Sequence, residues 1–172
     1  MKAVSTMKKV NKFLLGAIQA LVDLGIISNG LLGIGFLIVG LIYIFTDAIS
    51  FKQIGNNWGI EFLLYLDILF FMAIFLYGCL ALHNILNNIN LQKYFAPANM
   101  VALRKLMFSF LALTILDGIN TVINHFINIT AQLDFFPCGN YYSFFTSLII
   151  CYLIYFIFKR GLALQNENNS II

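Results

Sequence analysis

Long, uninterrupted apolar runs, rather than amphipathic patterns, organise this chain. No charged residue lies between Asp23 and Asp47, and the stretch 26–46 would extend about 31 Å as a helix, which is about one bilayer core. Three further apolar runs follow, at 62–82, 106–127 and 142–158. Because every backbone polar group in lipid has to be hydrogen-bonded within the protein, these runs predict helices. The sequence therefore predicts an all-α polytopic membrane protein, with four transmembrane helices in one membrane domain covering 1–172.

The composition agrees with lipid as the main solvent, since 61% of the residues are hydrophobic and only 10% are charged, against about 25% charged in an ordinary soluble domain. The first run continues to Thr46, too far for a cleaved signal peptide. Residues 13–25 carry Gln19 and Asp23 on the side away from their apolar residues, and are predicted to lie at the interface or to lengthen the first span. The first span also contains glycines that predict close helix contacts: Gly30, Gly33, Gly35 and Gly40.

The distribution of basic residues predicts the orientation. Nine of the ten Lys and Arg residues lie before the first span, between the second and third, or after the fourth, and only Lys52 lies elsewhere. By the positive-inside rule, both termini and the loop 83–105 are cytoplasmic, and the loops 47–61 and 128–141 are exterior. Ala96-Pro97 predicts a break before the third helix.

The third run carries a polar stripe centred on Asp117. With 100° between successive residues of a helix, the polar residues of this stripe lie within about 60° on either side of Asp117. A carboxyl near the middle of a span costs about 2.5 to 3.5 kcal/mol on insertion scales, so Asp117 has to be paired, hydrogen-bonded or neutral. Asp67 in the second run lies at a similar depth. One hypothesis is a polar cavity that is open to the exterior and binds a proton, cation or small polar ligand, with these members: Asp67, Asp117, Asn120, Thr121, Asn124 and His125. The alternative is interhelical hydrogen bonding within a tight bundle.

No enzyme signature is present in the sequence. The chain has neither a metalloprotease nor a nucleophile-elbow motif, nor a phosphate-cradling glycine loop, and its three cysteines lack metal-ligand spacing. We therefore predict no enzymatic activity, no cofactor and no metal. The net charge of +3 comes from residues scattered at helix ends, which favours contact with the lipid bilayer over direct nucleic-acid binding.

Two of the segments that are predicted to be cytoplasmic carry recognisable motifs. The central one runs Tyr94-Phe95-Ala96-Pro97-Ala98-Asn99-Met100-Val101-Ala102-Leu103-Arg104, and the other is Phe158-Lys159-Arg160-Gly161 with Leu164 and Glu167. Together they resemble the bacterial family called domain of unknown function 2975. The matching residues of the central motif are Phe95, Asn99, Leu103 and Arg104, and those of the tail include Arg160, Gly161 and Glu167. The family's usual Gly-x-Pro before the Phe is replaced here by Gln92-Lys93-Tyr94.

The resemblance implies a four-span protein of the bacterial plasma membrane without an assigned activity, often encoded beside a small helix-turn-helix regulator. We accordingly expect a regulatory or sensing protein whose motifs dock a cytoplasmic regulator protein, although structural interlocking of the two motifs would explain them equally. Two alternatives stay open: a small transporter or channel subunit that uses the intramembrane Asp residues, and self-immunity against a membrane-active peptide. A homo-oligomer is a further expectation.

Overall fold

The computed structural model describes residues 2–46, 58–127 and 141–170. They form four helices: α1 (Lys2–Thr46), α2 (Trp58–Asn90), α3 (Pro97–Ile127) and α4 (Tyr141–Ser170). Each helix contains a segment that is long and apolar enough to cross a membrane, and these residues contain no strand. The predicted all-α architecture with four candidate spans is confirmed, which is the architecture of a multi-pass membrane protein.

The helices are longer than the apolar runs that predict them. Helix α1 has 45 residues, or about 68 Å, and is continuous, so residues 13–25 belong to the same helix as the first span. Helix α2 continues to Asn90 and α3 begins at Pro97. Of the predicted loop 83–105, only residues 91–96 connect two helices, because the polar residues on either side of this connection are helical. The predicted loops 47–61 and 128–141 lie outside the described residues, apart from their last few positions.

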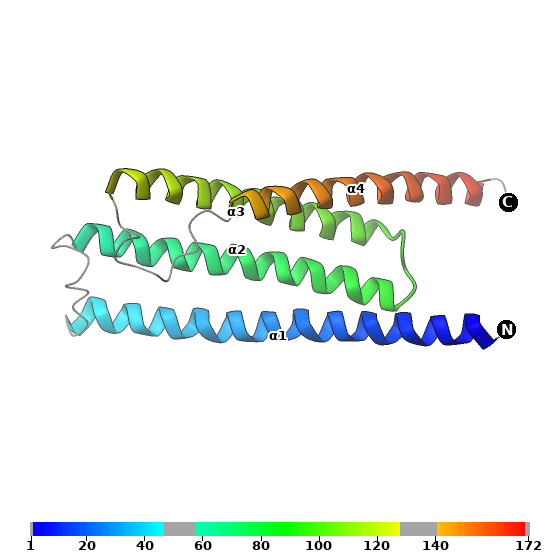
Figure 1. Ribbon diagram of the computed structural model, residues 1–172, viewed down its shortest axis with the longest axis horizontal. Helices are drawn as coiled ribbons and strands as arrows, with labels where there is room; N and C mark the ends of the chain where they lie inside the picture. The colour runs from blue at the N-terminus through cyan, green and yellow to red at the C-terminus, as the bar shows by residue number, and fades with distance from the viewer. Residues whose placement is uncertain (1, 47–57, 128–140, 171–172) are drawn as a thin grey trace.

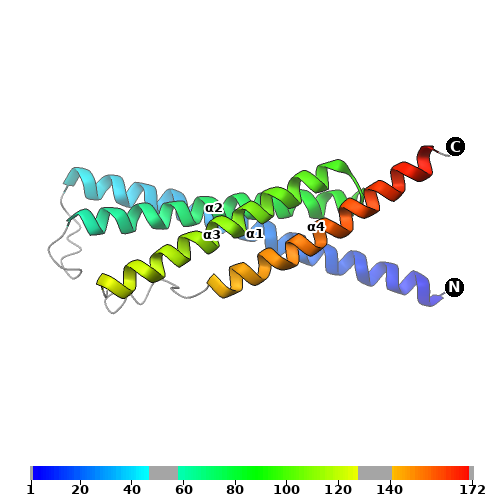
Figure 2. The same cartoon turned by 90° about the horizontal axis from the view of Figure 1, so that it is seen from above.

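The main helix contacts follow the order of the chain: α1 packs on α2, α2 on α3, and α3 on α4. Figure 1 shows α1 and α4 on opposite sides of the array, with α2 and α3 between them. From above, α1 and α4 splay apart toward the end where both termini lie (Figure 2). We call this end of the helix array the terminal end; its location in the cytoplasm stays a prediction. The arrangement is an open array and not a bundle closed by α1 against α4.

The core lies along α3 and consists of small and aliphatic side chains. Buried residues of α2 and α3, together with one from α4, form a single cluster: Ala81, Ile85, Ala102, Leu103, Leu106 and Cys151. Gly78 allows α2 to approach α3 closely, since a Cβ at this position would lie 2.5 Å from the Ser109 Oγ. The Ser109 hydroxyl donates to the carbonyl oxygen of Leu106 in its own helix. Small residues at helix contacts are typical of packing in lipid, where close approach replaces the hydrophobic effect.

Helix α1 contacts the array through a seam of period 3.5. Eight of its described positions that are not exposed recur at alternating spacings of four and three: Leu15, Gln19, Val22, Ile26, Asn29, Gly33, Phe36 and Gly40. The other three, Asp23, Gly25 and Gly30, each lie next to one of them. Such spacing is typical of a left-handed helix pair. Gly40 packs against the Tyr65 ring of α2, as predicted. The predicted close contacts at Gly30, Gly33 and Gly35 are wrong within the described residues, because a Cβ there would meet no atom within 4 Å; polar side chains, rather than a glycine stripe, hold this pair.

Candidate functional site

The intramembrane carboxyl group of Asp67 contacts the polar stripe of α3. The Asn120 Nδ2 donates a hydrogen bond to the Asp67 Oδ2 across 2.7 Å. Asp117 is buried, with 5% of its surface exposed, and lies close enough to Asp67 for the two carboxyl groups to interact electrostatically. The structure therefore brings together Asp67, Asp117 and Asn120, as the sequence predicts.

The threonines of the stripe bond within their own helix. The Thr121 hydroxyl donates to the carbonyl oxygen of Asp117 at 2.8 Å, and the Thr114 hydroxyl donates to that of Phe110 at 2.7 Å. Such back-bonding satisfies a hydroxyl locally and makes no link between helices. Asn124 and His125 belong to α3, but their side chains lie outside the described residues, so the mouth of the predicted cavity is not described.

Asn99 is the centre of the second candidate region, at the terminal end. It is fully buried, and its Nδ2 donates to the carbonyl oxygens of Lys93 and Tyr94, both at 2.8 Å. The Asn99 Oδ1 accepts a hydrogen bond of 2.7 Å from the Asn88 Nδ2. Both protons and the oxygen of one amide group are thus used to fix the 91–96 connection against the end of α2.

The end of α2 is a Schellman motif, a C-terminal cap with two characteristic backbone hydrogen bonds. The Gln92 N–H donates to the Ile89 carbonyl oxygen and the Lys93 N–H to that of Asn88, each at 2.9 Å. This cap places Gln92 at φ 60°, a left-handed conformation in which glycine is usual because other residues cost about 1 to 2 kcal/mol. The turn itself requires no side chain at position 92, but the residue there carries the carboxamide group of Gln92.

The two sequence motifs interlock. The Phe95 ring lies on Gly161, where a Cβ would collide with it, and packs against the Phe158 ring with centroids 5.6 Å apart. Position 161 therefore has to be glycine, because the Phe95 ring occupies the space that a Cβ would need. Leu103 is buried, at 3% exposed. These contacts are those that the interlocking interpretation of the motifs predicts.

The motif arginines both lie against aromatic rings of α4, Arg104 from α3 and Arg160 from within α4 itself. The Arg104 Nε and Nη2 donate to the Tyr155 hydroxyl at 3.2 and 2.9 Å, with the guanidinium carbon 5.6 Å from the ring centroid. Arg160 lies over the Phe156 ring at 5.0 Å. Both side chains are exposed, and so is Glu167. The arginines thus combine an anchoring contact with a guanidinium group accessible to solvent or lipid headgroups.

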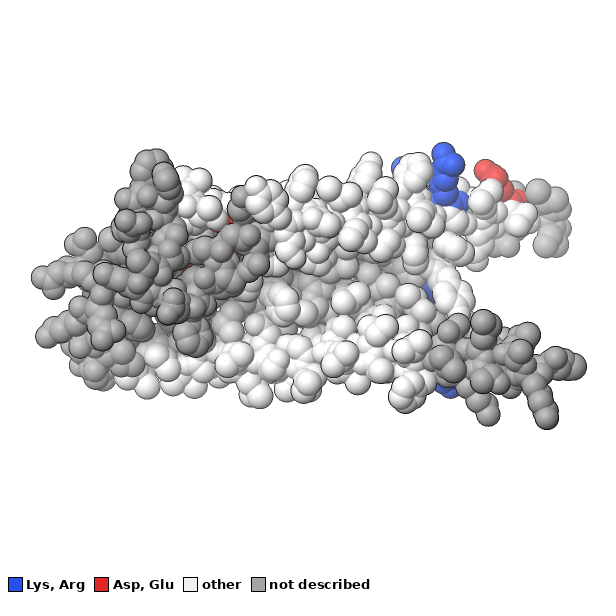
Figure 3. Space-filling view, viewed as in Figure 1, with Lys and Arg blue, Asp and Glu red and all other residues white. Residues whose placement is uncertain are grey.

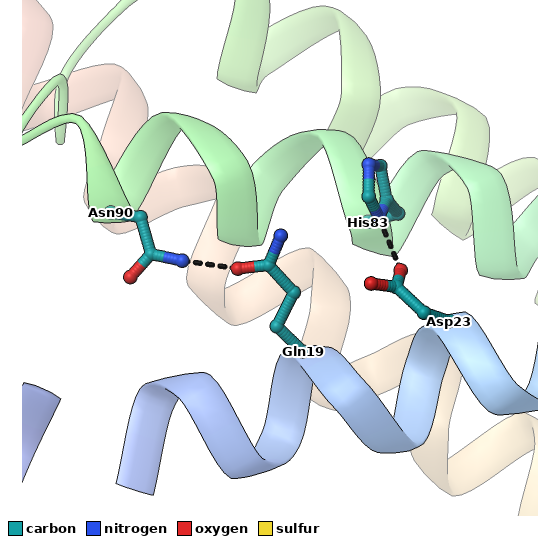
Figure 4. Close-up of polar contacts among 4 residues, drawn as sticks. All are labelled: Gln19, Asp23, His83 and Asn90. Carbon is teal, nitrogen blue, oxygen red and sulfur yellow. Dashed lines mark hydrogen bonds and ion pairs between the residues drawn. The ribbon is translucent and has the colours of Figure 1, made fainter. Parts of the chain in front are cut away.

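A third polar region, between α1 and α2, was not predicted. The Gln19 carboxamide accepts a hydrogen bond from Asn90, and the His83 Nδ1 lies 2.5 Å from the Asp23 Oδ1. Figure 4 shows the four side chains on facing sides of the two helices. Gln19 and Asp23 were predicted on the side away from the apolar residues of 13–25; their place on or beside the period-3.5 seam was the signal that could have paired them with α2.

Two further contacts continue this pairing toward the other end of α1. The Asn29 Nδ2 donates to the Met72 carbonyl oxygen at 2.9 Å, and the Tyr65 hydroxyl donates to that of Phe36 at 3.1 Å. Along these contacts the residue numbers in α1 rise while those of the contacted α2 residues fall, as in an antiparallel helix pair. Polar contacts thus define the alignment of α1 on α2 along most of its length.

Charge is concentrated at the terminal end. In Figure 3, the blue atoms and the most prominent group of red atoms lie toward that end, while white atoms cover the middle of the face. The exposed cations there come from α1, α3, α4 and the 91–96 connection: Lys12, Lys93, Arg104, Lys105, Lys159 and Arg160. In the described part of the chain, no three His, Cys, Asp or Glu side chains gather as a metal site would require.

No protein-family model, curated protein or solved structure significantly matches this chain. The resemblance of the two motifs to a bacterial family therefore stays a prediction.

Proposed function

We propose that this protein is a non-enzymatic, regulatory protein of the bacterial plasma membrane that binds a cytoplasmic partner at its terminal end. The observation that supports this most is the group of exposed cations on neighbouring helices at that end, which includes Lys105 and Lys159. The contact of Phe95 with Gly161 joins the α2–α3 connection to α4 as one unit, so that a partner bound to one element would affect the packing of both.

The face available to a partner is the cationic rim of this unit and not the motif residues inside it. Asn99 and Leu103 are buried, whereas Lys105 and Lys159 are exposed on neighbouring helices. A cationic rim attracts an acidic surface and accelerates its association. The family resemblance suggests a helix-turn-helix regulator as the partner. Because the DNA-binding face of such a regulator is itself cationic, the cationic rim would bind a different surface of the regulator.

The test is crosslinking and purification from native membranes, comparing wild type with the double variant Lys105→Glu, Lys159→Glu. Lys12→Glu is the matched control, because Lys12 is also an exposed cation but belongs to α1. We expect a soluble protein to copurify with wild type and the control and to be lost from the double variant. If no soluble protein copurifies with wild type, the partner proposal is wrong.

A second candidate function is cation or proton transport, favoured by the contact between Asp67 and Asn120 beside the buried Asp117. Intramembrane carboxyl groups that face other helices often mark ion pathways. Flux of protons and monovalent cations should be measured in proteoliposomes for wild type and for Asp67→Asn with Asp117→Asn. Asp23→Asn is the control, because Asp23 lies at the α1–α2 contact. A flux that survives in the double variant, or is absent from wild type, would exclude this function.

A further inference from the structure

A pocket of about 520 Å³ opens at the terminal end between the α2–α3 connection and α4. One wall is the segment 92–97, and the other includes Leu162, Gln165 and Asn166 of α4. The volume lies in the range of about 300 to 1,000 Å³ that is typical of small-molecule sites. The two walls are held together by Phe95 on Gly161, so the interlocked motifs also form the frame of the pocket.

The lining of the pocket favours an anion. Among the described residues that line it, Lys93 is the charged one, and carboxamide groups come from both walls, from Gln92 on one and from Gln165 and Asn166 on the other. Two acceptors of the connection, the carbonyl oxygens of Lys93 and Tyr94, are bonded to the Asn99 amide. The described lining therefore combines one ammonium group with several amide donors and includes no carboxylate that would repel a negative ligand.

The left-handed conformation of Gln92 is an independent observation at the same pocket. Its φ of 60° is a conformation that glycine adopts at little cost. Unusual backbone conformations persist where surrounding contacts fix them, and they occur often at ligand sites. Here the Schellman hydrogen bonds and the Asn99 amide fix the turn, and the result is a carboxamide at the edge of the pocket beside Lys93.

The depth of the pocket corresponds to the lipid headgroup region. Leu162 lies four residues beyond Phe158, the end of the last apolar run, which is about 6 Å along a helix. Phe95, Pro97 and Leu162 supply an apolar side. Basic pockets between transmembrane helices at this level are where phosphate headgroups bind.

We propose that this pocket binds a phosphate group, held by the Lys93 ammonium and by the carboxamides of Gln92, Gln165 and Asn166. The phosphate comes from the headgroup of an anionic phospholipid or from a soluble phosphate ester, which share this chemistry. The site goes beyond the proposed partner surface and does not depend on it, because its walls are complete within one chain.

Binding of phosphatidylglycerol and of diacylglycerol, which lacks the phosphate, to the detergent-purified full chain is to be measured by native mass spectrometry. The variants are Lys93→Gln and Lys93→Arg, with Lys12→Gln as the control cation at the same end. One Lys near a phosphate contributes about 1 kcal/mol, which is about fivefold in affinity. We expect phosphatidylglycerol to bind wild type, Lys93→Arg and Lys12→Gln alike and Lys93→Gln about fivefold more weakly.

A competition arm separates the two sources of phosphate. If inorganic phosphate or glycerol 3-phosphate displaces the lipid at millimolar concentration, the headgroup alone is recognised and a soluble ester is also a ligand; if neither does, the ligand is the intact lipid. Either result supports a phosphate site. Equal binding of both lipids to wild type, or equal binding of phosphatidylglycerol to wild type and Lys93→Gln, would overturn it. Thermal stability of each variant shows that the fold is retained.

Discussion

Helix α3 and helix α1 both pack against α2, but they do so in different ways. The α3 side contains the fully buried residues Leu113, Asn99 and Ser109. The α1 side is a narrow seam, and α1 leaves large side chains such as Phe13 and Leu21 exposed at 76% and 68%. The α2–α3 pair forms a core, whereas α1 is attached to α2 along one narrow seam.

The difference shows what holds helices together in lipid. Apolar side chains gain little by contacting each other when the alternative is a lipid tail, so close approach and hydrogen bonds decide the association. The α2–α3 pair has both, with Gly78 against Ser109 and Asn88 bonded to Asn99. The α1–α2 pair depends mainly on hydrogen bonds. We therefore expect α1 to separate from the array before α2, α3 and α4 separate from one another.

The largest effect is expected at Asn99. Asn99→Ala removes three hydrogen bonds at a fully buried position, and it leaves the carbonyl oxygens of Lys93 and Tyr94 without this donor. We expect a loss of about 3 kcal/mol in the free energy of unfolding, since each unsatisfied buried group costs about 1 to 3 kcal/mol. Reversible unfolding in mixed detergent micelles measures it.

Asn87→Ala is the matched control for this prediction, because Asn87 is exposed near the same end of α2. We expect its free energy of unfolding to stay within about 0.5 kcal/mol of wild type. If the two variants lose equal stability, the 91–96 connection is not a fixed part of the α2–α3 core, and the contrast with α1 disappears.

Gly78→Ala should have the next largest effect. The added Cβ would lie 2.5 Å from the Ser109 Oγ and 3.3 Å from its Cβ, which forces α2 and α3 apart. We expect a loss of about 1 to 2 kcal/mol in the same unfolding measurement, with partial recovery on addition of Ser109→Ala. Gly118→Ala is the control, since nothing lies within 4 Å of its Cβ position; it should be neutral or stabilising.

The sequence predicted the helices well and their ends poorly. Hydropathy reports which residues contact lipid, so it detects an apolar run but not the polar turns that extend α2 from 83 to 90 and α3 back from 106. The start of α3 at Pro97 was predicted by the Ala96-Pro97 break and is confirmed. The contact of Asp67 with Asn120 was also predictable, because two intramembrane polar groups at equal depth have few other partners. The interlocking of Phe95 and Gly161 was one of two alternatives, and only the position of α4 on α3 distinguishes them. No motif marks the pairing of Asp23 with His83.

The Asp23–His83 contact tests the attachment of α1 directly. Its two atoms are 2.5 Å apart, and interhelical hydrogen bonds in membranes are worth about 0.6 kcal/mol on average and about 1.7 at most. A double-mutant cycle of Asp23→Ala and His83→Ala should therefore give a coupling energy of about 1 kcal/mol. Hydrogen exchange should show faster exchange in α1 but not in α3.

A second cycle controls for indirect effects. Asp23→Ala combined with Thr114→Ala should give a coupling energy of zero within about 0.5 kcal/mol, because Thr114 bonds within its own helix. Faster exchange in α3 for the Asp23→Ala variant would mean that α1 is an integral part of the core and would contradict the comparison.

The smallest effect is expected at Asn29, halfway along the α1–α2 seam. Asn29→Leu removes one hydrogen bond of 2.9 Å to the Met72 carbonyl oxygen, but leucine occupies a similar volume and lipid solvates it well. We expect a loss of about 0.6 kcal/mol, read from hydrogen exchange of α1. Ser28→Ala is the control, because the Ser28 hydroxyl donates to the Gly25 carbonyl oxygen of α1 itself. A loss above about 2 kcal/mol at Asn29 would show that the seam excludes lipid as tightly as the α2–α3 core does.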